Sequence, residues 1–215
     1  MIHLRELSKS YPTRGGERII LHPTTLSIPS DKGVAVLGRN GAGKSTFLRI
    51  ISGVESPDSG IIVRTSNLSW PLGFSGGLNN SMTGSQNVRF IAQVNGVDSE
   101  EMISFVEDFA ELGHYMKERV GTYSSGMRAR LSFGISLAIR FDCYLIDEAT
   151  SVGDRWFRDK CLAAFNVRRE HTGVLMVSHN PKTIRQYCEI ALVLHKGHLV
   201  PFSDLDEAIQ FYLHG

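Results

Sequence analysis

The stretch Gly38-Arg39-Asn40-Gly41-Ala42-Gly43-Lys44-Ser45-Thr46 matches the pattern G-x-x-x-x-G-K-[ST] of a phosphate-binding loop. The run before it, 34–37 (Val-Ala-Val-Leu), is apolar and β-prone, and the segment 47–51 after it places apolar residues at helical spacing. The motif therefore lies between an expected strand and an expected helix, as such a loop requires. A chance glycine-rich turn is the competing interpretation, and the match at every fixed position argues against it.

Each residue type in this loop has a chemical reason. Three glycines let the backbone approach a polyphosphate closely, with its N–H groups pointing inward. The helix that begins near Lys44 adds its N-terminal N–H groups and the positive end of its dipole. We expect Lys44 to contact the β- and γ-phosphates and the Ser45 hydroxyl to ligate Mg²⁺. The predicted phosphate-binding residues are Gly38, Asn40, Gly41, Gly43, Lys44, Ser45 and Thr46.

Composition excludes several classes of protein. The chain has 215 residues and a formal net charge of +1, so it has no basic excess that would favour nucleic acid as a ligand. No stretch approaches the roughly 18 consecutive apolar residues needed to cross a bilayer, and the first residues lack the apolar core of a signal peptide. The three cysteines are odd in number and show no C-x-x-C spacing, so we expect neither disulfides nor zinc. These features predict a cytosolic protein.

Strands and helices alternate along the chain, which predicts an α/β fold with a mostly parallel central sheet and N-terminal antiparallel strands. One domain is expected over 1–215, with an inserted helical subdomain at about 71–140. Expected strands are 2–8 and 18–28, joined by a turn at 12–16, then 34–37, the pair 61–63 and 67–70, 141–146, 173–178, 190–194 and 198–202. Expected helices follow the phosphate-binding loop, lie within 84–112, and cover 125–139, 155–169 and the chain from 203.

Two further polar groups follow expected strands. Asp147 and Glu148 end the run 141–146, and His179 ends the run 173–178. In parallel sheets ligands bind beyond the carboxyl ends of the strands. Asp147 is predicted to hold Mg²⁺, Glu148 to act as the general base for water, and His179 to contact the γ-phosphate or orient the water. The competing interpretations are a solvated acidic loop and an ordinary turn histidine.

Two other positions suggest a nucleotide. Tyr11 lies between the first two strands, where an aromatic ring could stack on adenine or simply be a half-buried tyrosine. The segment Ser124-Ser125-Gly126 opens a helix and would form a second anion site in the same chain. Two such sites are useful when they meet at one nucleotide.

With these motifs, the sequence resembles the ATP-binding subunits of ABC transporters over essentially all of its length. In that family two copies pack head to tail, and each ATP lies between the phosphate-binding loop of one copy and the signature motif of the other. The resemblance implies ATP and Mg²⁺ as cofactors and a homodimer. It implies these roles: adenine stacking for Tyr11, γ-phosphate contact for Ser124 with Ser125 and Gly126, the Mg²⁺ aspartate for Asp147, the catalytic glutamate for Glu148, the D-loop aspartate for Asp154, and the switch histidine for His179.

Three departures from the family pattern stand out. In the signature, Ser125 replaces the first glycine and Met127 replaces the glutamine. The D-loop at 151–154 reads Ser-Val-Gly-Asp. No glutamine follows the strand at 67–70, where the family places its Q-loop, so residues 71–77 are expected to occupy that loop.

These departures look like those of the ATPases of polysaccharide exporters, and most resemble the capsular-polysaccharide export group of Gram-negative bacteria. The segments that carry this resemblance are 69–72 with Gly76-Gly77, 81–84, 123–127 and 152–154. It implies an ATPase at the cytoplasmic face of the inner membrane, two polytopic permease subunits and periplasmic export proteins as partners, and no contact with nucleic acid or with the polymer. The alternatives are export of another glycan such as O-antigen or teichoic acid, a soluble ABC ATPase without a transport role, and a small-molecule kinase.

Overall fold

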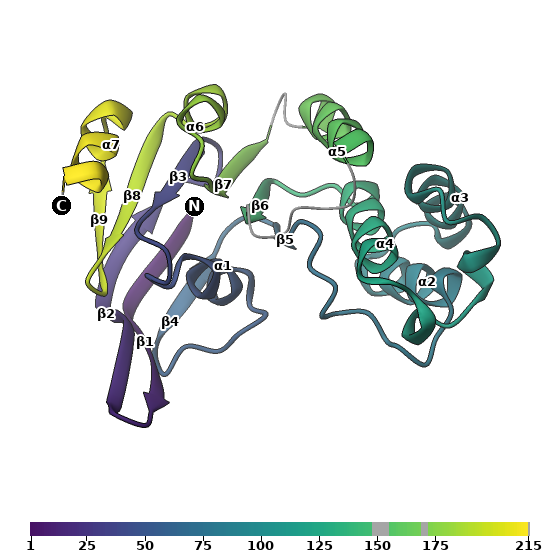
Figure 1. The fold of residues 1–215 in the computed structure, drawn as a ribbon, viewed down its shortest axis with the longest axis horizontal. Coiled ribbons are helices and arrows are strands. Elements are labelled where there is room, and N and C mark those ends of the chain that lie inside the picture. The colour runs from purple at the N-terminus through teal and green to yellow at the C-terminus, as the bar shows by residue number, and fades with distance from the viewer. Residues whose placement is uncertain (148–154, 169–171, 215) are drawn as a thin grey trace. The chain divides into compact units, whose positions relative to one another are not determined.

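The computed structural model describes residues 1–147, 155–168 and 172–214. These residues form two compact units, which are described separately (Figure 1). The first comprises 1–71, 141–147 and 172–214, and the second comprises 72–140 and 155–168. The expected helical subdomain covers about 71–140, and the helix at 155–168 clusters with the same unit.

The first unit contains a six-stranded sheet in the order β5-β6-β7-β3-β8-β9. The pairs from β5 to β8 are parallel, and β9 is antiparallel to β8. Its strands are β3 (Gly33–Leu37), β5 (Leu68–Pro71), β6 (Cys143–Asp147), β7 (Gly173–Val177), β8 (Ile190–His195) and β9 (His198–Phe202). Every residue of β3 and β7 is buried, as expected for central strands of a parallel sheet. The predicted mostly parallel sheet is confirmed.

A second, antiparallel sheet in the order β2-β1-β4 contains the N-terminal strands, as predicted. The strands β1 (Ile2–Thr13) and β2 (Gly16–Ile28) are longer than expected, so the turn lies within the predicted segment 12–16 but is shorter, with only two residues connecting the strands. Pro12 is tolerated because β4 (Ser59–Arg64) pairs with β1 only as far as Ser8, which leaves the other edge of β1 unpaired beyond that point.

The prediction that 61–63 and 67–70 form a strand pair is wrong. Strand β4 pairs with β1, whereas β5 belongs to the other sheet and pairs with β6. Each strand finds a partner that is distant in sequence, and no local signal in the short connection between β4 and β5 distinguishes this arrangement from a hairpin.

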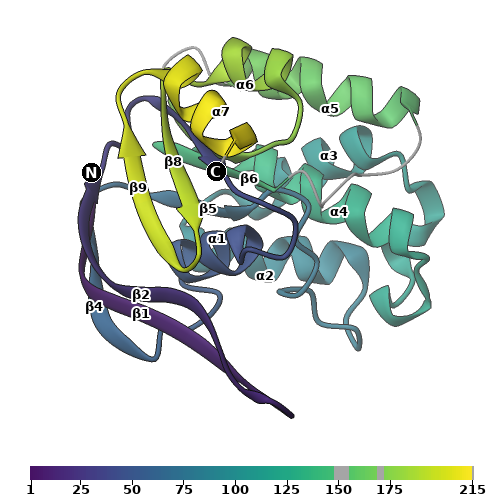
Figure 2. The same cartoon turned by 60° about the vertical axis from the view of Figure 1, so that its left-hand side comes forward.

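Three helices accompany these sheets: α1 (Lys44–Ser52), α6 (Pro181–Tyr187) and α7 (Leu205–His214). Helix α1 contributes Phe47, Leu48, Ile50 and Ile51 to a core that also contains side chains from both sheets, and Figure 2 shows it beside them. Helix α6 was not predicted, although Asn180 caps it by accepting a hydrogen bond from the Lys182 amide at 2.9 Å and Pro181 is its first residue.

The second unit is helical. It contains α2 (Gly84–Asn95), α3 (Ser99–Ala110), α4 (Ser125–Ala138), α5 (Arg155–Arg168) and two short 3₁₀ helices, Gly113–Lys117 and Val120–Thr122. The start of α2 is a capping box, in which Thr83 accepts from the Gln86 amide at 3.1 Å and the Gln86 side chain accepts from the Thr83 amide at 2.9 Å. Gln86 therefore has a local structural role.

Aromatic side chains form the core of this unit. The ring of Phe109 on α3 stacks at 6.1 Å on Phe133 of α4 and meets Phe157 of α5 edge-on at 5.6 Å. Lys160 connects α5 to the end of α3 by polar contacts. Its ammonium donates to the Phe109 carbonyl at 2.9 Å and lies 2.7 Å from a Glu111 carboxylate oxygen. The three helices thus pack around one aromatic residue.

Candidate functional site

The loop between β3 and α1 needs glycine at two positions. Gly38 has φ 153° and Gly43 has φ 106°, which are conformations that L-residues rarely adopt. A Cβ atom on Gly38 would lie 2.6 Å from the Leu194 carbonyl oxygen, and one on Gly43 would lie 2.4 Å from Cγ2 of Ile20. Backbone conformation and close packing therefore both require glycine at these two sites.

Lys44 begins α1 and is buried, with 7% of its surface exposed. Its ammonium donates to the Gly38 carbonyl at 2.7 Å and to the Arg39 carbonyl at 3.1 Å. The positive charge therefore lies against the backbone of the phosphate-binding loop. The first helical hydrogen bond runs from the Phe47 amide to the Gly43 carbonyl at 2.8 Å. The amides that precede it lie at the positive end of the helix dipole, which suits an anion.

A pocket of about 260 Å³ opens at this loop. It is lined by Tyr11, Arg18, Ile20, Gly41, Gly43, Lys44, Ser45 and Thr46. The predicted aromatic residue and most of the predicted phosphate-binding residues therefore share one pocket. Gly38 and Asn40 are outside this lining; Gly38 is buried at the start of the loop, and Asn40 is exposed.

Sequence reasoning missed two residues of this pocket. Arg18 and Ile20 lie two apart on β2, so they point to the same side of the strand. Arg18 is the cross-strand partner of Tyr11, and its guanidinium donates a hydrogen bond to the Gly41 carbonyl. The alternation of side chains along 16–28 was visible in the sequence, but the face that meets the loop depends on the strand register.

Asp147 and the phosphate-binding loop lie at the same edge of the sheet. In the ladders, Asp147 pairs with Val177 of β7, and Val177 pairs with Val36 of β3. Asp147 and Val36 are therefore in one row, two strand spacings or roughly 10 Å apart. Asp147 is 8% exposed. Its carboxylate is thus held on a central strand, close to the loop that leaves β3.

His179 follows β7, the strand between β6 and β3, so the sheet places it at this edge as well. Its side chain is exposed, and its Nδ1 lies 3.4 Å from the Tyr212 hydroxyl on α7. Glu148 and Asp154, which were predicted as the catalytic base and the D-loop aspartate, lie outside the described residues. The catalytic roles of Glu148 and His179, the metal-binding role of Asp147 and the D-loop role of Asp154 remain predictions.

The second predicted anion site belongs to the helical unit. Ser124 is the N-cap of α4, and its hydroxyl accepts from the Met127 amide at 3.2 Å. Ser124 and Ser125 are exposed, whereas the neighbouring Tyr123 is buried and donates to the Tyr115 carbonyl. An exposed, serine-capped helix N-terminus thus follows a buried aromatic residue, and the positive end of a helix dipole suits an anion.

The residues present fit a magnesium–nucleotide complex. Mg²⁺ prefers oxygen ligands and usually takes only one or two from the protein, with phosphates and water supplying the others. The Ser45 hydroxyl in the pocket and the Asp147 carboxylate at the sheet edge offer oxygen atoms of this kind. Among the described residues no cluster of three or more His, Cys, Asp or Glu side chains forms a metal site from protein alone.

Comparison with known proteins gave consistent matches. Residues 21–151 match the ABC transporter family. The chain is 48% identical to the capsule polysaccharide export ATP-binding protein CtrD of Neisseria meningitidis, over 99% of this chain and 98% of that protein. It is 45% identical to the polysialic acid transport ATP-binding protein KpsT of Escherichia coli, over 95% and 92% of the two chains.

A teichoic acids export ATP-binding protein of Bacillus anthracis is more distant, at 36% identity over 89% of this chain and 36% of its own length. Among solved structures, the ATP-binding cassette MJ0796, described as dimeric and bound to ADP and Pi, superposes with a TM-score of 0.73. That match covers 93% of this chain and 96% of the other at 19% identity, which shows a common fold.

Proposed function

The chain belongs to the ABC transporter family, and from this membership we propose that it is the ATP-hydrolysing subunit of an exporter of capsular polysaccharide. The observation that carries the proposal is the row of strand ends at one sheet edge. It brings together the phosphate-binding loop after β3, Asp147 at the end of β6 and His179 after β7. The near full-length similarity to CtrD and KpsT supports capsular polysaccharide as the cargo over teichoic acid.

The residues divide the work on ATP between them. Tyr11 stacks on the adenine, and Lys44 with the amides of the first turn of α1 compensates the charge of the phosphates. Ser45 and Asp147 hold Mg²⁺, which would neutralise charge on the β- and γ-phosphates. Glu148 takes a proton from the attacking water, and His179 contacts the γ-phosphate.

A second copy of the chain completes each site. Ser124 at the exposed N-terminus of α4 contacts the γ-phosphate that is bound to the partner's loop. ATP then closes the dimer because both copies bind the same nucleotide, and loss of the γ-phosphate opens the dimer again.

Within the described residues, no helix is both long enough and apolar enough to cross a bilayer. From the export roles that the names of CtrD and KpsT state, we place the chain at the cytoplasmic face of the inner membrane, held there by two permease subunits. The loop at 71–83 and the helical unit transmit the closing motion to them. Periplasmic export proteins act downstream, and the polymer does not touch this chain.

The experiment is to block hydrolysis and measure assembly. Glu148→Gln should retain ATP, so that light scattering in Mg²⁺ and ATP shows a shift from the 23.9 kDa single chain to twice that mass. The matched control is Glu148→Gln combined with Ser124→Arg, which removes the N-cap hydroxyl and places a bulky side chain at the helix end, and this double variant should stay a single chain.

Two results would overturn the proposal. One is a Glu148→Gln chain that remains a single chain in ATP even with its permease present. The other is a doubly substituted chain that dimerises as readily as Glu148→Gln alone, because the site would then not need Ser124. ADP formation that requires a small-molecule acceptor, with the phosphoryl group transferred to that acceptor, would instead favour a kinase.

A further inference from the structure

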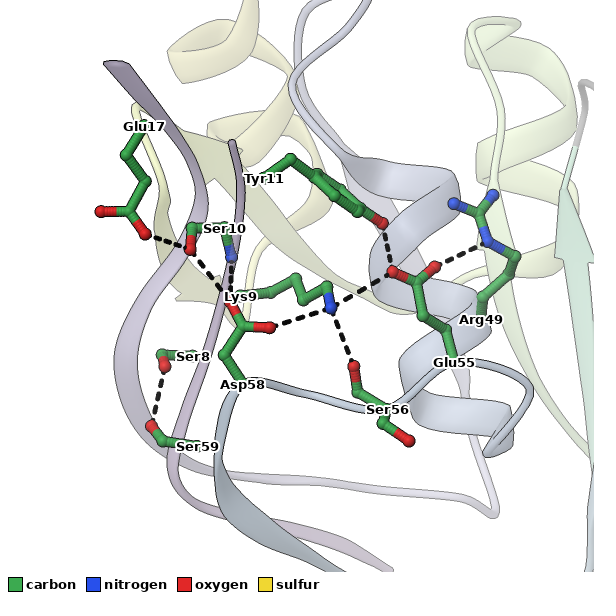
Figure 3. Close-up of polar contacts among 10 residues, drawn as sticks. All are labelled: Ser8, Lys9, Ser10, Tyr11, Glu17, Arg49, Glu55, Ser56, Asp58 and Ser59. Atoms are coloured by element: carbon green, nitrogen blue, oxygen red, sulfur yellow. Dashed lines mark hydrogen bonds and ion pairs between the residues drawn. The ribbon is translucent and has the colours of Figure 1, made fainter. Parts of the chain in front are cut away.

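Glu55 lies at the centre of a polar cluster beside the nucleotide pocket (Figure 3). One carboxylate oxygen accepts a hydrogen bond from the Tyr11 hydroxyl, and the other lies 3.0 Å from Nε of Arg49. The ammonium of Lys9 lies 3.6 Å from the first oxygen and 5.1 Å from the centre of the Tyr11 ring. Groups from β1 and from α1 therefore converge on one side chain.

The surroundings keep Glu55 ionised. Partial burial by itself would raise the pKa of Glu55, but hydrogen bonds from Tyr11 and Arg49 and the charges of Arg49 and Lys9 lower it below its ordinary value. The side chain is 21% exposed, so the contacts are partly shielded from water. A charge-assisted hydrogen bond to a tyrosine hydroxyl is stronger than one between neutral groups.

Glu55 is also fixed to the helix that carries the phosphate-binding loop. Its amide donates to the Arg49 carbonyl at 3.1 Å, just after α1 ends at Ser52 with Gly53 as its C-cap. Arg49 in turn donates to the Thr46 hydroxyl at 3.1 Å, and Thr46 lines the pocket. A continuous path of hydrogen bonds thus runs from the Tyr11 ring to the first turn of α1.

The backbone that carries Tyr11 lies on a hairpin whose tip is exposed. Tyr11 lies near the tip of the hairpin of β1 and β2, where residues 12–19 are exposed. A half-buried ring on such a ribbon would sample several orientations, and ordering it on binding would cost affinity. The bond to Glu55 selects one orientation in advance.

We infer that Glu55 is a positioning residue for the nucleotide, which holds the Tyr11 ring in the orientation that receives the base. The inference rests on the proposed function. It separates two parts of the ligand: the phosphates are bound by the loop, whereas the base is bound through Tyr11 and therefore depends on Glu55.

The test compares ATP with inorganic triphosphate, which has no base, by titration calorimetry. Glu55→Ala should weaken ATP binding about tenfold and change triphosphate binding less than about twofold. Tyr11→Phe keeps the ring and removes the hydroxyl, so it should act in the same way. The double variant should be no weaker than either single variant, because both remove one interaction.

Two variants serve as controls. Glu55→Gln keeps an acceptor for the Tyr11 hydroxyl and should retain most of the ATP affinity of the unmodified chain. Asp58→Ala removes a second acidic residue of the cluster, which contacts Lys9 at 2.9 Å and accepts hydrogen bonds from Ser10, whereas the Tyr11 hydroxyl donates to Glu55. This variant should leave ATP affinity unchanged. If Glu55→Ala does not fold, Tyr11→Phe carries the test alone.

Equal loss of ATP and triphosphate affinity in Glu55→Ala would overturn the inference, because Glu55 would then merely support the loop helix. Unchanged ATP affinity in both Glu55→Ala and Tyr11→Phe would overturn it as well. If the unmodified chain binds no ATP, the proposed function fails and the inference falls with it, whereas the other two results leave the proposed function intact.

Discussion

Gly43→Ala tests whether the phosphate-binding loop needs glycine for two reasons: the backbone conformation of Gly43 and its close packing against Ile20. Gly43 precedes α1 with φ 106°, and a Cβ atom there would lie 2.4 Å from Cγ2 of Ile20. Alanine would therefore meet two separate penalties: a disfavoured backbone conformation and a collision with a side chain that is only 4% exposed and cannot move freely.

The two penalties can be put in numbers. A non-glycine residue at this φ costs about 1–3 kcal/mol, and overpacking in a dense core costs about 1–3 kcal/mol. We expect Gly43→Ala to lower the free energy of unfolding by about 2–6 kcal/mol, and to weaken ATP binding in the fraction that remains folded, because the loop must shift.

Urea unfolding followed by circular dichroism measures this, with Gly96→Ala as the matched control. Gly96 ends α2 with φ 67° and has no atom within 4 Å of the position of a Cβ. Gly96→Ala meets the backbone penalty alone, so we expect its free energy of unfolding to fall by only about 1–2 kcal/mol. ATP affinity should not change in this control.

A double-mutant cycle with Ile20→Ala isolates the collision. Removing the Ile20 side chain beyond Cβ should make Gly43→Ala about 1–3 kcal/mol less costly than in the unmodified chain. Equal costs of Gly43→Ala in both backgrounds would refute the reasoning, and so would a Gly43→Ala chain as stable as Gly96→Ala.

Two more predictions follow from buried and charged groups. Burial raises the pKa of the Cys143 and Cys161 thiols to about 12, and Cys188 is also buried. A disulfide reagent at pH 8 should therefore label the folded chain slowly and should label all three thiols after denaturation. Rapid labelling of the folded chain would contradict this packing. The folded-state pKa of Glu55 lies below its ordinary value of 4.5, so its ionised form stabilises the fold above that pH, and this contribution is lost as the pH falls through the folded pKa. Urea midpoints measured from pH 6 to pH 3 should therefore fall more steeply for the unmodified chain than for Glu55→Gln, and parallel profiles would show that the cluster does not stabilise the fold.

Local patterns were sufficient for much of this protein. The phosphate-binding loop is a contiguous motif, so its strand, its turn and the helix that begins at Lys44 were readable directly. The apolar runs ending at Asp147 and before His179 predicted buried strands, because a parallel sheet covered on both faces needs continuous apolar residues. The cap at Ser124 was likewise a local signal.

Tertiary structure alone decided which strands are neighbours and what surrounds the pocket. The order β6-β7-β3 places Asp147 near the loop, and the separation of β4 from β5 contradicted a hairpin that the sequence allowed. Arg18 and Glu55 showed no local pattern, since they are an ordinary exposed arginine and an acidic residue after a helix. Arg18 donates to Gly41 and Glu55 accepts from Tyr11, which are 23 and 44 positions away, and such long-range contacts are set by strand register and core packing.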